Sequence, residues 1–176
     1  GGENRFQSVY AGLQKIQGYC LKASLKNISK HTVIIHDGAR PFIDKGFILE
    51  LIKEITAPEV SCVIPTSYLT SSLLNKTTNL YYKSVQRGDF LLAQTPQCFR
   101  FKKIYLAYKY FQSKSHFFTD DFSVFDLYYN NVKKNNFKDC ERVIKYVSGR
   151  DYNIKITTEL DYIMSTKISE FLKTKK

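Results

Sequence analysis

The chain has 176 residues, of which 27 are Lys or Arg and 16 are Asp or Glu, so its formal net charge is +11. Its 43% apolar content, without any apolar run near the ~20 residues that cross a bilayer, excludes a transmembrane protein and predicts a soluble globular one. This length favours a single domain with a sizeable core. The charge suits an anionic ligand, such as a nucleotide or a sugar phosphate, although scattered solvated lysines explain much of the excess.

The cysteines and histidines do not form a recognisable metal or disulfide pattern. They are Cys20, Cys62, Cys98, Cys140, His31, His36 and His116. The cysteines lie far apart without a C-x-x-C pair, which favours reduced, mostly buried thiols over a zinc site or a disulfide framework. None of the histidines has an evident companion at metal-ligand spacing.

The first third of the chain alternates between helix and strand patterns. Apolar residues recur every three or four positions over residues 4–16, which predicts an amphipathic helix directly after Gly1 and Gly2. Residues 31–37 are typical of a short buried strand, 47–55 of a second helix and 60–65 of a second strand. Strand, helix and strand at this spacing predict a crossover unit, and hence a parallel sheet that helices cover on both faces.

The pattern changes between residues 66 and 94. Turn signals at 75–79 and 88–89, with alternating stretches around them, predict an antiparallel arm that leaves the sheet.

The remaining elements follow the arm in the order helix, helix, polar loop, strand, short strand and helix. Their predicted ranges are 102–112, 121–129, 129–137, 142–147, 153–156 and 160–172. Thr158 followed by Asp161 suits the start of the last helix. The predicted inner stripe of that helix consists of Leu160, Ile163, Met164, Ile168, Phe171 and Leu172.

Polar clusters lie where predicted strands end or helices begin. They are HDGARP at 36–41, TPQ at 95–97, TDD at 119–121 and GRDYNIKIT at 149–157. Because ligands of open α/β sheets bind outside the carboxyl ends of the strands, we expect Asp37 and Arg40 to face a ligand crevice.

Each cluster also has a simpler structural interpretation. Asp37 suits a turn, Thr95 a strand exit, Thr119 and Asp120 a helix cap, and Lys155 an edge strand. Taken together, these acids, hydroxyls and cations favour a site for anionic substrates over a hydrolytic site, since no Ser-His-Asp or Cys-His arrangement accompanies them.

Five of these motifs, in this order, resemble those of the 2-C-methyl-D-erythritol 4-phosphate cytidylyltransferase family. They read GGENRFQSVYAGL, IHDGARP, TPQCF, TDDFS and GRDYNIKIT, and the resemblance runs from residue 1 to about residue 161. Gly38 stands where the family usually has Ala. The resemblance implies a Rossmann-like α/β nucleotidyltransferase sandwich with a mostly parallel central sheet and a protruding β arm through which two subunits dimerise. It implies one domain over residues 1–176, with the arm at 66–94, that lacks the first strand and glycine-rich loop of the family.

The same resemblance implies an enzyme of non-mevalonate isoprenoid precursor biosynthesis. That enzyme transfers CMP from CTP to 2-C-methyl-D-erythritol 4-phosphate with Mg²⁺ and releases pyrophosphate. Two departures keep alternatives open. Without the glycine-rich loop, the chain is either a fragment or a truncated homologue that acts only as a binding or dimerising module. Leu69 stands where the family has a substrate-contacting Thr, unless Thr70 fills that place, so the acceptor can instead be ribitol 5-phosphate or another polyol phosphate.

The resemblance also implies roles for individual residues. The positions matched to nucleotide binding are Gly2, Glu3, Ser8 and Asp37, where Glu3 replaces the usual Asp. Asp37 also matches the metal ligand and, with Lys155, the catalytic positions. The positions matched to the acceptor phosphate are Arg40, Arg87, Thr95, Thr119 and Lys155, and Arg87 is expected to reach across the dimer.

The expected partners are therefore small molecules and a second copy of the chain. RNA binding is the weakest alternative, because the Tyr and Phe residues follow helix stripes and are more simply core residues. No membrane partner is expected. The expected compartment is a bacterial cytoplasm or a plastid-type organelle.

Overall fold

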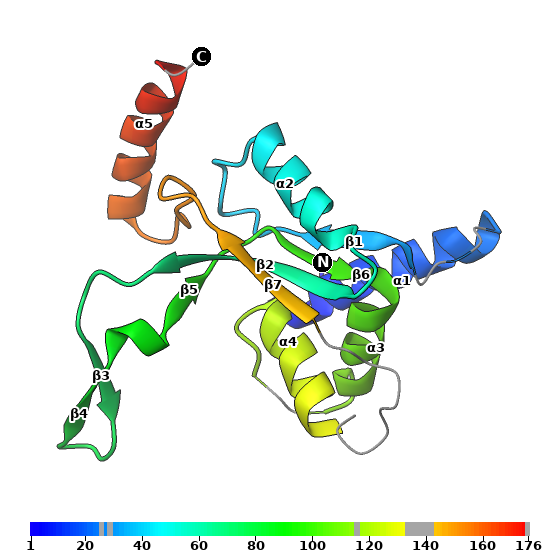
Figure 1. Cartoon of the computed structure of the whole chain (residues 1–176), viewed down its shortest axis with the longest axis horizontal. Helices are drawn as coiled ribbons and strands as arrows, with labels where there is room; N and C mark the ends of the chain where they lie inside the picture. The colour runs from blue at the N-terminus through cyan, green and yellow to red at the C-terminus, as the bar shows by residue number, and fades with distance from the viewer. Residues whose placement is uncertain (25–26, 28–29, 115–116, 133–142, 175–176) are drawn as a thin grey trace.

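The computed structural model describes residues 1–24, 27, 30–114, 117–132 and 143–174. A five-stranded sheet forms its centre, as Figure 1 shows. Its strands are β1 (Thr32–Ile35), β2 (Val60–Tyr68), β5 (Leu91–Ala93), β6 (Gln97–Arg100) and β7 (Val143–Ser148). The strand order is β1-β6-β2-β5, and β7 also pairs with β2. Strand β2 is thus the central strand of the sheet.

The sheet is mixed. Strands β1, β2 and β7 run in one direction, since β2 pairs with β7 in parallel and both β1 and β2 pair with β6 antiparallel. The α/β class and the crossover from β1 to β2 are therefore confirmed, but the two strands are not neighbours. Strand β6 lies between them, and we did not predict it as a strand because its four residues directly precede a helix.

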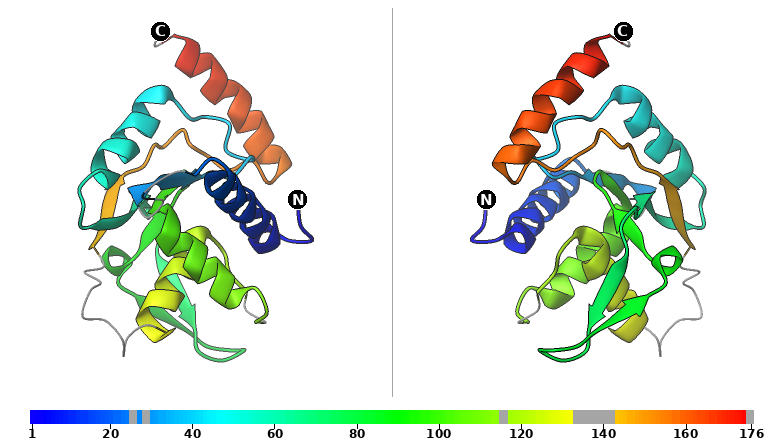
Figure 2. Two further views of the ribbon diagram at one scale, coloured as in Figure 1. Left: turned by 90° about the vertical axis from the view of Figure 1, so that its right-hand side faces the viewer. Right: turned by 90° about the vertical axis from the view of Figure 1, so that its left-hand side faces the viewer.

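Helices cover both faces of the sheet, as expected (Figures 1 and 2). Helix α2 (Lys45–Ile55) packs Phe47, Leu51 and Ile55 against β2 and β6 on one face. Helices α1 (Arg5–Lys22), α3 (Phe101–Phe111) and α4 (Asp121–Leu127), followed by a π-helix at Tyr128–Val132, cover the other face. Full burial of a Phe, Leu or Ile side chain such as these stabilises the fold by about 1.5–3 kcal/mol relative to leaving it exposed.

The helix starts follow capping chemistry. Asn4 accepts a hydrogen bond from the Gln7 N–H at the start of α1, and Asp120 forms a reciprocal capping box with Ser123 at the start of α4. The predicted start of α1 is confirmed, but the helix extends to Lys22.

The predicted arm is confirmed as a structure. Strands β3 (Leu73–Lys76) and β4 (Tyr82–Val85) form an antiparallel hairpin that projects from the sheet (Figure 1). A 3-10 turn at Arg87–Asp89 leads from it into β5. The Thr78 hydroxyl accepts hydrogen bonds from the N–H groups of Leu80 and Tyr81 in the hairpin turn.

Two predicted elements differ from the structure. Residues 153–157 form no strand; Ile156 N–H donates to the Ala39 carbonyl, which tethers this segment to the loop after β1. Helix α5 (Glu159–Lys173) forms as predicted and carries the predicted Thr158 cap, but its apolar stripe is not buried. Leu160, Ile163 and Phe171 are at least half exposed. Periodicity identifies residues that share a helix face; it does not supply a surface to cover them.

Cys20, Cys62 and Cys98 are buried, as expected, whereas Cys140 and His116 lie outside the described residues. Burial raises the pKa of the Cys98 thiol to about 12, so this side chain behaves as an apolar group. Within the described ranges, we find no helix with both the length and the apolar character that a bilayer span needs.

Candidate functional site

The candidate site is a pocket at the carboxyl end of β1, which we call the Asp37 pocket. It has a volume of about 310 Å³ and is lined by Arg5, Ser8, Val9, Ile35, His36, Asp37, Gly38, Ala39 and Lys155. The apolar residues Val33 to Ile35 end at the sheet edge, so the next two side chains leave the core. This is the crevice position expected for an α/β sheet.

Three cations surround the Asp37 carboxylate. Arg5 Nε lies 3.0 Å from Oδ1, whereas Lys155 Nζ lies 3.2 Å and Arg40 Nε 3.9 Å from Oδ2. The Asp37 side chain is only 14% exposed. Burial opposes ionisation of Asp37, but hydrogen bonds and charges from Arg5 and Lys155 outweigh it, so its pKa lies below the ordinary value. The predicted trio of Asp37, Arg40 and Lys155 is thus brought together.

Arg5 connects this pocket to a buried cluster that sequence reasoning missed. Its Nη1 and Nη2 atoms donate to Oδ1 and Oδ2 of Asp121 over 3.1 and 2.6 Å, and Tyr108 O–H donates to Asp121 Oδ1 over 2.6 Å. Burial and the Asp121 carboxylate raise the pKa of Tyr108, so the phenol remains a donor. The sequence offered only weak signals for this contact, because Arg5 in GGENR and Asp121 in TDD lie 116 residues apart.

A second network holds the main chain of Asp37. Its N–H donates to the Thr95 hydroxyl over 3.0 Å, and that hydroxyl lies 3.2 Å from His36 Nδ1. Because the hydroxyl oxygen accepts from Asp37, its proton is available to Nδ1, which leaves Nε2–H to donate to the Arg40 carbonyl over 2.7 Å. Thr95 is 3% exposed, so in this structure it holds the loop after β1.

Asn153 ties the segment that carries Lys155 to the same loop. Its side-chain amide donates to the Gln94 side chain over 3.1 Å and to the Thr95 carbonyl over 2.8 Å. Arg40 in turn donates to the Asn153 carbonyl over 2.7 Å. Asn153 Oδ1 and Arg40 Nε are buried without a hydrogen-bond partner in the part of the chain that the structure describes. Asn153 Oδ1 can accept a hydrogen bond and the Arg40 Nε–H can donate one, but neither residue lines the Asp37 pocket.

Of the predicted nucleotide-binding residues, Gly2 and Glu3 lie in a turn directly before α1, and Ser8 lies in the helix itself. Gly2 N–H donates to the Ser8 hydroxyl over 2.8 Å, and that hydroxyl donates to the Asn4 carbonyl over 3.0 Å. A Cβ atom on Gly2 would lie 2.4 Å from Gln7 Cβ, so the turn requires glycine. Glu3 has an exposed side chain beside this turn.

Of the predicted site residues, Ser8, Asp37 and Lys155 line the pocket. Gly2, Arg40 and Thr95 do not line it but contact Ser8 or Asp37. Thr119 and Arg87 lie further from it in the fold. Thr119 is exposed directly before α4, where Asp120 rather than Thr119 supplies the helix cap. Arg87 lies on the arm, where its Nη1 donates to the Thr70 carbonyl over 2.6 Å. Their assignment to the acceptor phosphate remains a prediction.

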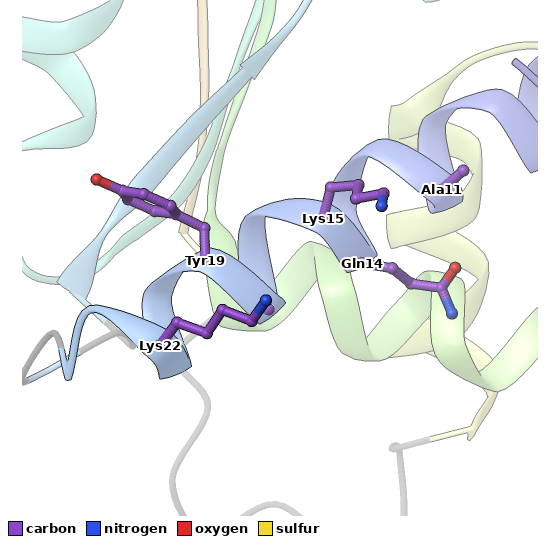
Figure 3. A pocket seen from close by; sticks show the side chains of 6 residues that line it. Ala11, Gln14, Lys15, Tyr19 and Lys22 are labelled. Carbon is purple, nitrogen blue, oxygen red and sulfur yellow. The ribbon is translucent and has the colours of Figure 1, made fainter.

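A larger hollow of about 570 Å³ runs along α1 and shares no lining residue with the Asp37 pocket. Figure 3 shows Ala11, Gln14, Lys15, Tyr19 and Lys22 projecting from this one helix, and Gly18 completes the lining. It has no carboxylate and joins no strand end, so it lacks the chemical groups that the Asp37 pocket combines.

Within the described ranges, no three His, Cys, Asp or Glu side chains gather as a metal cage. Asp37 is the one carboxylate among the pocket-lining residues. A divalent cation in this pocket would therefore take most of its ligands from substrate and water.

The sequence matches the family described as 2-C-methyl-D-erythritol 4-phosphate cytidylyltransferase (IspD) over residues 1–170. A protein of that name from Caldicellulosiruptor saccharolyticus is 34% identical over 98% of the chain, and one from Dictyoglomus thermophilum is 32% identical over 93%. The chain covers 66% and 62% of these relatives, which is less than two thirds of their length.

Solved structures agree on the fold. The crystal structure of 4-diphosphocytidyl-2C-methyl-D-erythritol synthase from Anaerococcus prevotii is 26% identical, has a TM-score of 0.73, and matches 98% of this chain and 66% of that one. The 2-C-methyl-D-erythritol 4-phosphate cytidylyltransferase of Thermus thermophilus gives a TM-score of 0.71 at 24% identity, with coverage of 97% and 71%. The α/β nucleotidyltransferase fold is thereby confirmed. Sequence and structure together show that the chain belongs to the 2-C-methyl-D-erythritol 4-phosphate cytidylyltransferase family.

Proposed function

We propose that the protein containing this chain transfers CMP from CTP to 2-C-methyl-D-erythritol 4-phosphate and releases pyrophosphate. The observation that carries the proposal is the Asp37 pocket. One carboxylate with Arg40 and Lys155 lies at the end of β1, beside the Gly2–Ser8 turn that matches the nucleotide-binding positions of the family. Curated relatives with that activity in their names support it.

The chemistry suits a pocket rich in cations. An oxygen of the acceptor phosphate forms a bond to the α-phosphorus of CTP, and the bond from that phosphorus to the pyrophosphate oxygen breaks. Two polyanions must approach, so the main requirement is charge neutralisation and positioning. Lys155 has a 42% exposed side chain that can act as a mobile point charge on a phosphate. No general base is needed, because the attacking phosphate is already ionised.

The residues of the pocket fit Mg²⁺ bound mainly by substrate. In phosphate-transferring sites, Mg²⁺ is typically held by one or two carboxylates, substrate phosphates and water. Asp37 Oδ2 would be the protein ligand, and its cationic neighbour Lys155 would then turn towards a phosphate. When bound, the ion neutralises the charge that develops on the phosphate oxygens.

We propose that two copies of the chain associate through the arm. The arm and the adjoining strands expose large apolar side chains, namely Tyr68, Leu74, Leu80, Tyr81, Tyr82, Phe90, Leu91 and Leu92. Apolar side chains in this number on a projecting hairpin suit a protein interface. Arg87, also on the arm, would then bring its guanidinium to the acceptor phosphate of the other subunit.

The arm also supports ribitol 5-phosphate as a second candidate acceptor. Leu69 offers no hydroxyl at the position where the family has Thr, and Arg87 bonds the main-chain carbonyl of the next residue, Thr70. This part of the arm therefore departs from the family at the acceptor end of the proposed reaction.

The relatives named above are bacterial, which favours a bacterial cytoplasm over a plastid as the compartment. Fractionation of the source cells, with detection of the protein in each fraction, tests this proposal.

The deciding experiment measures pyrophosphate release by the product of the complete reading frame. Reactions contain CTP and Mg²⁺ with 2-C-methyl-D-erythritol 4-phosphate, ribitol 5-phosphate or no acceptor. We expect turnover with 2-C-methyl-D-erythritol 4-phosphate and only background release without acceptor. Preferential turnover of ribitol 5-phosphate would replace the acceptor, and no turnover of either would leave only a binding or dimerising module.

A further inference from the structure

Arg5 occupies an unusual place, because its guanidinium bonds a buried carboxylate and the proposed metal-binding carboxylate at once. We propose that Arg5 is a positioning residue that orients the Asp37 carboxylate, and that Asp121 and Tyr108 hold Arg5 in place. The inference rests on the proposed function, since it assigns Asp37 to the reaction. It adds Arg5, Asp121 and Tyr108 to the residues on which the proposed reaction depends.

The geometry of the guanidinium supports this role. Its two terminal nitrogens donate in parallel to the two oxygens of Asp121, so one edge of the planar group is fixed. The third nitrogen, Nε, then donates to Asp37 Oδ1 over 3.0 Å. The three residues come from the first turn of α1, from α3 and from the first turn of α4. Packing of these helices therefore sets the position of Arg5.

Burial distinguishes this network from an ordinary surface ion pair. The Asp121 side chain has no exposed surface, and Tyr108 is likewise fully buried. A buried carboxylate without partners would be strongly destabilising, so Asp121 needs Arg5 for stability. Two bonds from Arg5 and one from Tyr108 already meet that need. The bond to Asp37 adds nothing to the solvation of Asp121, but it fixes a second carboxylate.

The consequence for Asp37 is a division between its two oxygens. The terminal torsion of an Asp side chain is broad, so the carboxylate is free to rotate unless its surroundings restrain it. Thr95 holds the Asp37 main chain, and Arg5 takes Oδ1. Oδ2 is thereby left for Lys155 and Arg40, on the side where a ligand would bind.

Arg5→Lys tests the proposal, because lysine keeps the charge but cannot bond both carboxylates in this fixed geometry. We expect kcat to fall by about 10- to 100-fold, as for other residues that orient a metal ligand, with the KM for acceptor changed less than about 3-fold. Arg150→Lys is the matched control. Arg150 is 27% exposed against 30% for Arg5 and also pairs with a carboxylate, but it lies outside the pocket. We expect its kcat to stay within about 2-fold of wild type.

A double-mutant cycle separates positioning from stability. If Arg5 acts through Asp37, Arg5→Lys should cost less than about 2-fold in kcat when Asp37 is already Asn. A loss of equal size in both backgrounds would overturn the proposal. Tyr108→Phe leaves all three Arg5 hydrogen bonds in place, so it should reduce kcat less than Arg5→Lys does. A larger loss for Tyr108→Phe would contradict the central role of Arg5. Thermal unfolding of each variant identifies losses that come only from misfolding.

Binding of Mn²⁺ with CTP, followed by electron paramagnetic resonance, gives a readout without turnover. We expect Arg5→Lys to weaken Mn²⁺ binding by about 10-fold and Arg150→Lys to leave it unchanged. No Mn²⁺–CTP binding by the wild-type protein would refute the proposed function itself. Equal binding by the wild type and Arg5→Lys would refute only the role of Arg5. This measurement decides the matter even where Asp37→Asn turns over too slowly to assay.

Discussion

The Asp37 pocket and the arm are held together by different kinds of contact. In the pocket, Asp37 bonds Arg5 and Thr95, which lie 32 and 58 residues away, and Arg5 bonds Asp121 over 116 residues. In the arm, the hairpin turn is closed by bonds among Thr77, Thr78 and Tyr81. Leu80 at its tip is 97% exposed.

The two regions are therefore ordered in different ways. The pocket is built by the packed body of one chain, and its charged groups are paired before any ligand binds. The arm has local hydrogen bonds but leaves its large apolar side chains uncovered. Variants of the pocket should therefore affect chemistry or folding, whereas variants of the arm should affect association.

The largest effect is expected at Lys155, and it tests whether the pocket performs the chemistry. Of the three cations beside Asp37, Lys155 has the most exposed side chain. Lys155→Ala removes this cation, and kcat should fall by about 10²-fold or more. Lys145→Ala is the control, since Lys145 lies on β7, pairs with Glu54 of α2 and does not line the pocket. Steady-state pyrophosphate release measures both. An unchanged rate for Lys155→Ala would make it an ordinary surface lysine.

The second prediction sets the body of the fold against the arm. Gln97 is 1% exposed and bonds both Asp120 Oδ2 and the Phe122 N–H, so Gln97→Ala should lower the free energy of unfolding by about 1–3 kcal/mol. Leu80→Ser should change it by less than about 0.5 kcal/mol. Urea unfolding at low protein concentration compares the monomers.

Sedimentation of the same two variants completes this test. Leu80→Ser should weaken self-association, whereas Gln97→Ala should leave it unchanged at temperatures where the protein is folded. Equal loss of stability for both variants would remove the distinction between body and arm.

The smallest effect concerns α5, whose start is also held by local contacts. Hydrogen bonds from the Thr157 N–H and hydroxyl and from Thr158 lower the pKa of Asp161 to about 2. The ionised cap is thus fully present above the ordinary Asp pKa and is lost as the pH falls towards 2. Thr157→Val should raise this pKa, and Thr166→Val, in the same helix, should not. Carboxyl carbon chemical shifts across a pH titration measure it; an ordinary pKa in wild type would contradict the local network.

Much of the fold could be predicted because its signals are local. Apolar periodicity located the helices, and turn residues located the arm. Strand β6 was not predicted, because the four residues QCFR carry no local signal that they form a strand between β1 and β2. The prediction that the apolar stripe of α5 is buried was wrong for a similar reason. The apolar pattern is local, but burial of the stripe depends on which elements pack against the helix.

The site shows the same limit. Asp37, Arg40 and Lys155 could be expected to meet, because strand ends gather at one edge of a sheet. Arg5, Asp121 and Tyr108 could not, since each resembles an ordinary helix residue in sequence and their contact exists only after three helices have packed.

The span between Arg5 and Asp121 also affects how the protein is made. During synthesis, Arg5 and Asp37 leave the ribosome long before the carboxylate that holds Arg5, which lies 116 residues further along the chain. Contacts of such long sequence separation form late in folding. A chain that ends before α4 lacks the carboxylate that fixes Arg5, so this part of the pocket is completed only after residue 121 has been made.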